Sequence, residues 1–189
     1  SGDWSSDVCS SDLVNYVSVN DYIKFANNDW IQVTDVTTAN VTLATPLTAN
    51  VGSGTAVSRK WEYADEFDGA PGTTEYASNK SGSADEIHIV VVDQDGLISG
   101  VPGTVVEKYP FLSKGSDVKS ADGTALYYPL VIFNKSKWIY WGDHNTAGTN
   151  WGNTAQNTVY TNVEKPSYDS LGGGADSVPG DDDLIRGYD

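Results

Sequence analysis

The sequence predicts an α+β fold in which β-strands predominate. We expect a small N-terminal β-barrel-like module, then a mixed sheet with a central β-hairpin and few short helices. Short alternating runs separated by Asn, Asp and Gly fill residues 14–60, and a mostly β-branched run spans residues 87–92, followed by the turn residues 93–96. The chain has 189 residues, enough to bury a real core in one domain or two small ones.

Residues 14–60 are expected to form the barrel-like module. Five short strands separated by turn residues predict a small barrel or sandwich. Such barrels often bind oligonucleotides or sugars, but the only cations here are Lys24, Arg59 and Lys60, which favours a structural role. The strand-length segments are 16–19, 22–25, 30–36, 41–43 and 55–58.

Residues 61–84 resemble an irregular crossing, and Trp61 and Tyr63 are expected to anchor it on the sheet. Residues 61–144 as a whole are expected to form the core sheet segment. Residues 126–133 predict a short helix or strand, interrupted by Pro129 in either case.

The central hairpin is expected to begin with residues 87–92, whose apolar character suits a strand covered on both faces. Asp93-Gln94-Asp95-Gly96 is turn chemistry, because Asp side chains bond nearby backbone and Gly accepts a positive φ. Residues 97–98 and then 104–109 supply the return strand. The Pro102-Gly103 breaker between them predicts a kink or bulge.

The last part of the chain is predicted as one further strand and a loop. Residues 138–141 resemble another strand of the core sheet. Residues 145–189 are rich in Gly, Asn, Thr and Asp, which predicts an acidic Gly-rich surface loop leading to a missing domain.

Both ends suggest an internal fragment, since the chain contains no methionine. Residues 1–13 carry a near-repeat of Ser-Ser-Asp and are interpreted as a non-native leader of translated adapter sequence, with a native Ser-rich loop as the alternative. Cys9 then carries no functional weight.

Charge and composition exclude several classes of function. The chain has 26 acidic against 11 basic residues, a net charge of −15, which opposes binding to nucleic acid and to anionic membranes. No apolar run approaches the roughly 20 residues that cross a bilayer, and no export signal is evident. A single cysteine excludes an internal disulfide framework and fits a reducing compartment such as bacterial cytoplasm.

No candidate metal site in the sequence has the number and spacing of ligands that a metal ion requires. Asp93 and Asp95 before Gly96 resemble a calcium loop, but the glycine comes too early and Thr104 stands where a bidentate Glu should close the site. Residues 181–183 are three aspartates, which we interpret as a solvated acidic loop. The only histidines are His88, within the predicted strand, and His144, too few for a zinc site.

The sequence predicts no catalytic or cofactor-binding residue, and therefore no enzyme. There is no Gly-x-Ser-x-Gly elbow and no phosphate-binding loop. Asp143 and His144 are the only adjacent acid and imidazole, but neighbours at a strand end point apart. Nothing in the spacing of the acidic residues selects a pair for glycoside cleavage.

Four aromatic residues suggest a rival function, a non-catalytic carbohydrate-binding β module. Trp138, Tyr140, Trp141 and Trp151 offer flat faces for stacking on sugars. On a strand, however, Trp138 and Tyr140 share one face and Ile139 and Trp141 the other, so both faces are apolar. That pattern favours burial between layers or against a neighbouring subunit.

Four segments in order carry a resemblance to a known family. They are Trp-Glu-Tyr-Ala-Asp-Glu-Phe-Asp-Gly-Ala-Pro-Gly-Thr (61–73), Asp-Glu-Ile-His-Ile-Val-Val-Val-Asp-Gln-Asp-Gly (85–96), Ile-Ser-Gly-Val-Pro-Gly-Thr-Val-Val-Glu-Lys-Tyr (98–109) and Lys-Trp-Ile-Tyr-Trp-Gly-Asp-His (137–144). Together they resemble the tail sheath protein of contractile-tailed, myovirus-type bacteriophages, over nearly half the chain. Residues 14–60 would then be a decorating or spacer module.

The resemblance implies a structural virion protein. Sheath subunits stack helically as hexameric rings around the tail tube and contract when the baseplate triggers them, which drives the tube through the host envelope for genome ejection and host cell entry. The implied partners are other copies of the chain, the tail tube protein, and the baseplate and tail terminator proteins, without a cofactor. The implied location is the virion tail sheath, assembled in the bacterial host cytoplasm. Terminal arms that add strands to neighbours are expected to lie outside this sequence.

Overall fold

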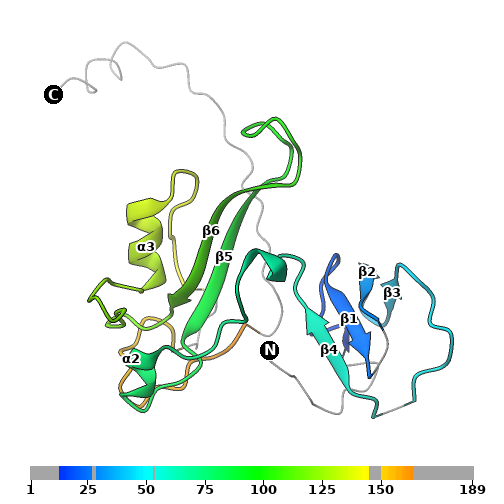
Figure 1. Ribbon diagram of the computed structural model, residues 1–189, viewed down its shortest axis with the longest axis horizontal. Helices are drawn as coiled ribbons and strands as arrows, with labels where there is room; N and C mark the ends of the chain where they lie inside the picture. Colours follow the sequence, from blue (N-terminus) through cyan, green and yellow to red (C-terminus); the bar gives the residue numbers. More distant parts are fainter. Residues whose placement is uncertain (1–12, 27–28, 53, 145–149, 164–189) are drawn as a thin grey trace.

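The computed structural model describes residues 13–26, 29–52, 54–144 and 150–163 (Figure 1). Two antiparallel sheets dominate this part of the chain, one of four strands and one of two, and the few helices are short. The predicted α+β class with a predominance of strands is therefore confirmed.

The N-terminal sheet has the strand order β3-β2-β1-β4 (Figure 1). Its strands are β1 (Tyr22–Phe25), β2 (Ile31–Val36), β3 (Val41–Leu43) and β4 (Val57–Lys60). Val17, Ile23 and Val33 are fully buried on it. Four of the five predicted strands are thus present. Strands β1 and β3 have the predicted bounds, and β2 and β4 begin one and two residues later than predicted.

The sheet is open, and the described residues form no closed barrel. Residues 16–19, predicted as the first of the five strands, form turns instead, so that prediction is wrong. The amide of Ser18 donates to the carboxylate of Asp21 at 2.9 Å, and Asn20 has a φ of 73°. This local hydrogen bond competes with strand pairing, and Val17 covers the sheet as a core side chain rather than extending it.

The predicted hairpin is confirmed. Strand β5 (Glu86–Asp93) pairs antiparallel with β6 (Thr104–Ser113), and the register shifts between Ile87 and Ile89 and between Val91 and Val92. These irregularities lie inside the ladder. Pro102 and Gly103, where the kink or bulge was predicted, lie in the connection before β6. Residues 97–98, predicted as part of the return strand, lie in the connection, because the Asp93 carboxylate accepts hydrogen bonds from the amides of Ile98 and Ser99.

Helix α3 (Tyr128–Lys135) covers one face of the hairpin, and most residues of β5 are only partly covered. The buried residues of this core are Ile87, Tyr109, Leu112, Tyr128, Val131 and Ile132. Along β5 only Ile87 and Asp93 are buried, so the prediction of a strand covered on both faces is wrong. β-branched residues also suit a half-exposed strand, and apolar character alone does not report burial.

Helix α3 resolves the ambiguity left by the sequence at residues 126–133. Pro129 lies in its first turn, where a missing N–H costs nothing and a fixed φ favours the helix. The following residues 138–141 are not a strand, so that prediction is wrong. The hydroxyl of Ser136 accepts from the amides of Trp138 and Ile139, at 3.2 and 3.0 Å, which bends the backbone away from an extended ladder.

The crossing between the two sheets contains η1 (Ala64–Glu66) and α2 (Glu75–Ser78). A series of aromatic rings fastens it to the hairpin. Trp61 stacks on Phe67 at 6.0 Å, and Phe67 stacks on His88 of β5 at 4.0 Å with an interplanar angle of 8°. The amide of Phe111 donates to Nδ1 of His88, which assigns the ring proton to Nε2, opposite the Gly69 carbonyl oxygen at 2.9 Å. The predicted anchoring role of Trp61 is thus exerted through Phe67.

Residues 150–163, which we name the strap, lie against the hairpin and α2. Tyr160 is only 2% exposed, and its amide donates to the carbonyl of Ser83 at 2.9 Å. Gly82 permits this approach, since a Cβ there would lie 2.5 Å from the carbonyl oxygen of Ala155. The strap is irregular, as predicted, and many of its side chains are exposed, but Ala155 and Tyr160 are buried. Residues 1–12, 145–149 and 164–189 lie outside the described residues. The first of these ranges contains all of the predicted leader except Leu13.

We expect Phe67→Ala to lower the free energy of unfolding by about 1–3 kcal/mol, because it removes a half-buried ring stacked on both sides. Urea denaturation followed by tryptophan fluorescence measures the change. The neighbouring Asp68 is exposed, so Asp68→Ala serves as control and should stay within about 0.5 kcal/mol. Equal losses in both variants would contradict the anchoring role of the stack.

Candidate interaction surface

A buried carboxylate organises the polar interior beneath the hairpin. Asp85 is fully buried, immediately before β5, and accepts hydrogen bonds from the amide and hydroxyl of Thr74 at 2.8 and 2.9 Å and from the hydroxyl of Ser113 at 2.6 Å. Thr74 is also the N-cap of α2, where its hydroxyl accepts from the amide of Ala77. One carboxylate therefore joins the start of α2 to the open end of the hairpin, where β5 begins and β6 ends.

Lys114 extends this network to the strap. Its side chain is almost fully buried, and Nζ donates to the carbonyl of Thr161 at 3.2 Å and lies 5.3 Å from the ring centroid of Trp151. Burial lowers the pKa of Lys114 to about 8, against an opposing attraction from Asp85. The Lys114 side chain thus links the hairpin to the strap.

Ser113, Asp85 and Lys114 together contain a hydroxyl, an acid and an amine. All three side chains are buried, and the hydroxyl of Ser113 donates to Asp85 rather than facing solvent. A nucleophile must reach its substrate. The arrangement therefore serves the fold. Sequence reasoning missed Asp85 and Lys114 because no motif marks them and hydropathy predicts that charged residues lie outside.

His144 is held by tyrosines rather than by its acidic neighbour. The indole N–H of Trp141 donates to the hydroxyl of Tyr128 at 3.2 Å, and that hydroxyl is hydrogen-bonded to Nδ1 of His144 at 2.8 Å. The carboxylate of Asp143 accepts a hydrogen bond from the backbone amide of His144. Burial raises the pKa of Tyr128. The cluster fastens the segment after α3 to the helix.

In the turn of the hairpin, the Asp93 side chain bonds nearby backbone groups, as the sequence predicted. The Asp93 carboxylate accepts from the amides of Ile98 and Ser99 and from the Ser99 hydroxyl, and the hydrogen bond from the Ser99 amide contributes most to lowering the pKa of Asp93. In the described part of the chain, no three His, Cys, Asp or Glu side chains gather as a metal site would require. Asp181 and its two neighbours lie outside the described residues.

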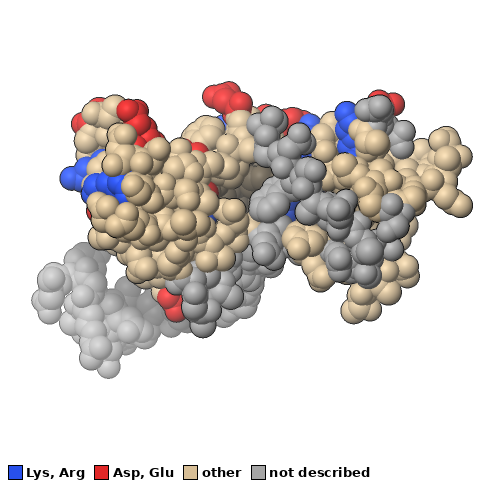
Figure 2. Space-filling view, turned by 90° about the horizontal axis from the view of Figure 1, so that it is seen from below, with Lys and Arg blue, Asp and Glu red and all other residues tan. Residues whose placement is uncertain are grey.

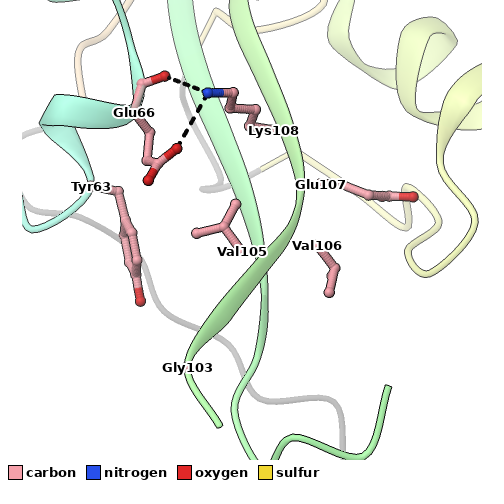
Figure 3. A pocket seen from close by; sticks show the side chains of 7 residues that line it. All are labelled: Tyr63, Glu66, Gly103, Val105, Val106, Glu107 and Lys108. Atoms are coloured by element: carbon pink, nitrogen blue, oxygen red, sulfur yellow. Dashed lines mark hydrogen bonds and ion pairs between the residues drawn. The ribbon is translucent and has the colours of Figure 1, made fainter. Parts of the chain in front are cut away.

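An open hollow of about 520 Å³ lies between η1 and β6 (Figure 3). Nζ of Lys108 bridges it by donating to the carbonyl and carboxylate of Glu66, at 3.0 and 3.3 Å. Glu107 points away from Tyr63 and Glu66 in this view. The predicted sugar-stacking aromatics are absent from its lining, which consists of Tyr63, Glu66, Gly103, Val105, Val106, Glu107 and Lys108.

Two groups of exposed apolar side chains stand out instead. The first, which we name the tip, comprises Leu97, Ile98 and Val101 in the hairpin connection, with Leu97 89% exposed. The second, which we name the α3 face, comprises Leu130 and Phe133 of the helix with Trp138 and Tyr140 after it. Groups of exposed apolar side chains are typical of interaction sites.

The α3 face corrects the expectation for Trp138 and Tyr140. On a buried strand both rings would be covered, but Tyr140 is 80% and Trp138 44% exposed, because the bend at Ser136 turns this segment out of the sheet. Ile139 alone packs partly on the core, and Trp151 packs edge-on against Tyr128. Figure 2 shows that charged side chains on the face seen from below form small separate groups with uncharged surface between them.

Comparison of the chain with protein-family models, curated protein sequences and solved structures gives no match. Within the residues that the structure describes, no helix has the length and apolar character needed to span a bilayer.

We expect Lys114→Met to remove a pH dependence of stability. The folded pKa of about 8 lies below the ordinary 10.5, so between these values the unfolded chain binds more protons and stability rises with pH. The wild-type protein should gain on the order of 1–2 kcal/mol between pH 7.5 and pH 9.5 from this lysine. Tyr160, with a pKa raised to about 12, stays protonated across that range.

Urea denaturation at several pH values measures the effect, and Lys119→Met is the matched control because Lys119 is exposed. Parallel pH profiles for the wild-type protein and Lys114→Met would contradict the assignment.

Proposed function

We propose that this chain is a structural subunit of a contractile phage tail sheath, which polymerises around the tail tube and contracts to drive it through the host envelope. One observation carries the proposal beyond the sequence resemblance. The four segments that resemble the sheath family, separated along the chain, pack against one another as a single unit. The proposal expects such packing, because the family resemblance treats the four segments as parts of one structural unit.

The contacts between the four segments are specific. Phe67 of the first segment stacks on His88 of the second, and the second pairs with the third as the β5–β6 hairpin. The third holds the fourth through Glu107, whose carboxylate accepts from the amide of Lys137 and the hydroxyl of Ser136, both at 2.7 Å. These hydrogen bonds also lower the pKa of Glu107, against the effect of its burial.

The interior suits a part that moves as a rigid body. Asp85, Lys114 and the strap join the hairpin to α2 with hydrogen bonds between buried groups, and such a unit transmits load without internal rearrangement. In a sheath, the work of contraction would come from the summed interfaces between rigid subunits, without a nucleotide. The partners would be other copies in hexameric rings, the tail tube, the baseplate and the tail terminator.

The complete reading frame that contains these 189 residues tests the proposal directly. We expect its purified product to form striated tubes in negative-stain electron microscopy, since sheath subunits stack as helical rings. A variant with Asp85→Ala is the matched control, because loss of the buried carboxylate should abolish the tubes together with the folded unit. A well-folded wild-type product that stays a small particle at high concentration would contradict the proposal.

A second candidate function is a non-catalytic carbohydrate-binding module. The exposure of Trp138 and Tyr140 favours it, because exposed rings stack on sugar faces. Their position outside the open hollow beside β6 weighs against it, since the rings line no cleft there.

Retention on insoluble polysaccharides distinguishes this candidate. If Trp138 and Tyr140 bind sugar, Trp138→Ala and Tyr140→Ala should each reduce retention at least tenfold, about 1.4 kcal/mol, without loss of folding. Trp30 is 43% exposed on the other sheet, so Trp30→Ala is the matched control. No retention of the wild-type protein, or equal retention of all variants, removes the candidate.

A further inference from the structure

The tip is a rigid apolar projection. Figure 1 shows the β5–β6 connection extending beyond α3. The Asp93 carboxylate accepts hydrogen bonds from the amides of Ile98 and Ser99 inside the loop. The amide of Val101 donates to the hydroxyl of Ser99 at 3.2 Å, and the hydroxyl of Thr104 donates to the carbonyl of Val101 at 2.7 Å. A loop ordered before binding loses little conformational entropy on binding.

The backbone conformation of the tip keeps its apolar side chains exposed to solvent. Gly96, Gly100 and Gly103 have φ values of 74°, 85° and 78°, a region that other residues rarely adopt. These glycines turn the backbone so that Leu97 and Val101 face solvent on an ordered loop. Apolar side chains held out in this way indicate a contact with another surface.

The α3 face is the natural counterpart within the same sequence. Phe133 is 72% exposed, and Leu130 lies one helical turn before it on the same side of α3. The tip and the α3 face are both exposed in one chain, so they do not cover each other within it.

The charges beside the two surfaces are complementary. Asp95 is exposed at the tip, whereas Lys135 and Lys137 are exposed beside the α3 face, in a chain with only 11 basic residues. Asp95 and the net charge of −15 oppose contact between the tip and an anionic membrane. The charge pattern favours a protein surface bearing lysines.

We propose that the tip of one copy docks on the α3 face of the next copy, with Asp95 set against Lys135. This inference rests on the proposed function, for which it names the self-contact. The two surfaces belong to different elements, so the contact is head-to-tail and leaves each copy with one free tip and one free face. Such a contact propagates along a ring or helix.

The contact is weak between two isolated copies. A stable pair buries roughly 800 Å² on each partner, more than a few side chains supply. In a closed ring or a stacked lattice, each subunit is held by several such contacts at once, which multiplies the affinity. Covalent capture is therefore the appropriate measurement.

Disulfide capture tests the contact in the full 189-residue chain carrying Cys9→Ser. We expect an oxidised mixture of Leu97→Cys and Phe133→Cys proteins to form mixed dimers, and the double variant to form a ladder of oligomers. The control pairs Phe133→Cys with Thr38→Cys, placed in an exposed bend of the other sheet. Mixed dimers no more abundant than in the control, or Leu97→Cys proteins that pair mainly with themselves, would overturn the proposal.

A charge exchange tests the polar part. Asp95→Lys on the Leu97→Cys protein and Lys135→Glu on the Phe133→Cys protein should each lower the yield about two- to fivefold, a range typical of exposed ion pairs. The two changes together should restore it. Failure of the exchange to restore the yield would overturn the pairing of Asp95 with Lys135.

The outcomes separate this inference from the proposed function. Tubes from the complete reading frame without capture between positions 97 and 133 would overturn the inference and leave the sheath proposal intact. Capture without tubes would support the head-to-tail contact and count against the sheath. Binding of the chain to neutral phosphatidylcholine vesicles, lost in Leu97→Ser, would assign the tip to a lipid surface and overturn the inference.

Discussion

The hydrogen bonds of one buried carboxylate hold the second half of this protein together. Asp85 accepts from Thr74 and Ser113, and its charge favours the buried ammonium of Lys114, which in turn reaches the strap at Thr161. Removing the carboxylate would leave the Thr74 amide and hydroxyl and the Ser113 hydroxyl without their acceptor in the interior, a loss on the order of 1–3 kcal/mol for each unsatisfied group. Asp85 joins helix α2 to the hairpin directly, and Lys114, the residue after β6, continues the network to the strap.

The same centre explains which surfaces stay open. The strap and α2 gather at the base of the hairpin, and α3 covers one of its faces, so no described segment remains for the tip. Leu97 and Phe133 are consequently exposed on ordered backbone rather than on loose loops. A rigid base with apolar side chains at its outer ends suits a subunit that works through contacts with its neighbours, which is the basis of both proposals.

The sequence predicted those elements whose formation is decided locally. The turn at Asp93 to Gly96 follows from side-chain to backbone hydrogen bonding, and the hairpin around it pairs as predicted. Pro129 marked the beginning of a helix rather than a break, which local pattern alone left open. The strand expected at Trp138 failed because the Ser136 hydroxyl bends the backbone, and the barrel failed because a turn at Ser18 replaces its first strand.

By itself the sequence determined the predominance of strands and the hairpin with its turn, since each depends on neighbouring residues. Only the tertiary structure decided that Asp85 and Lys114 are buried, that the strap belongs to the core, and that Trp138 and Tyr140 face solvent. The physical reason is that burial of a charge depends on partners remote in sequence. Thr74, Ser113 and Thr161 meet these two side chains only when the chain has folded.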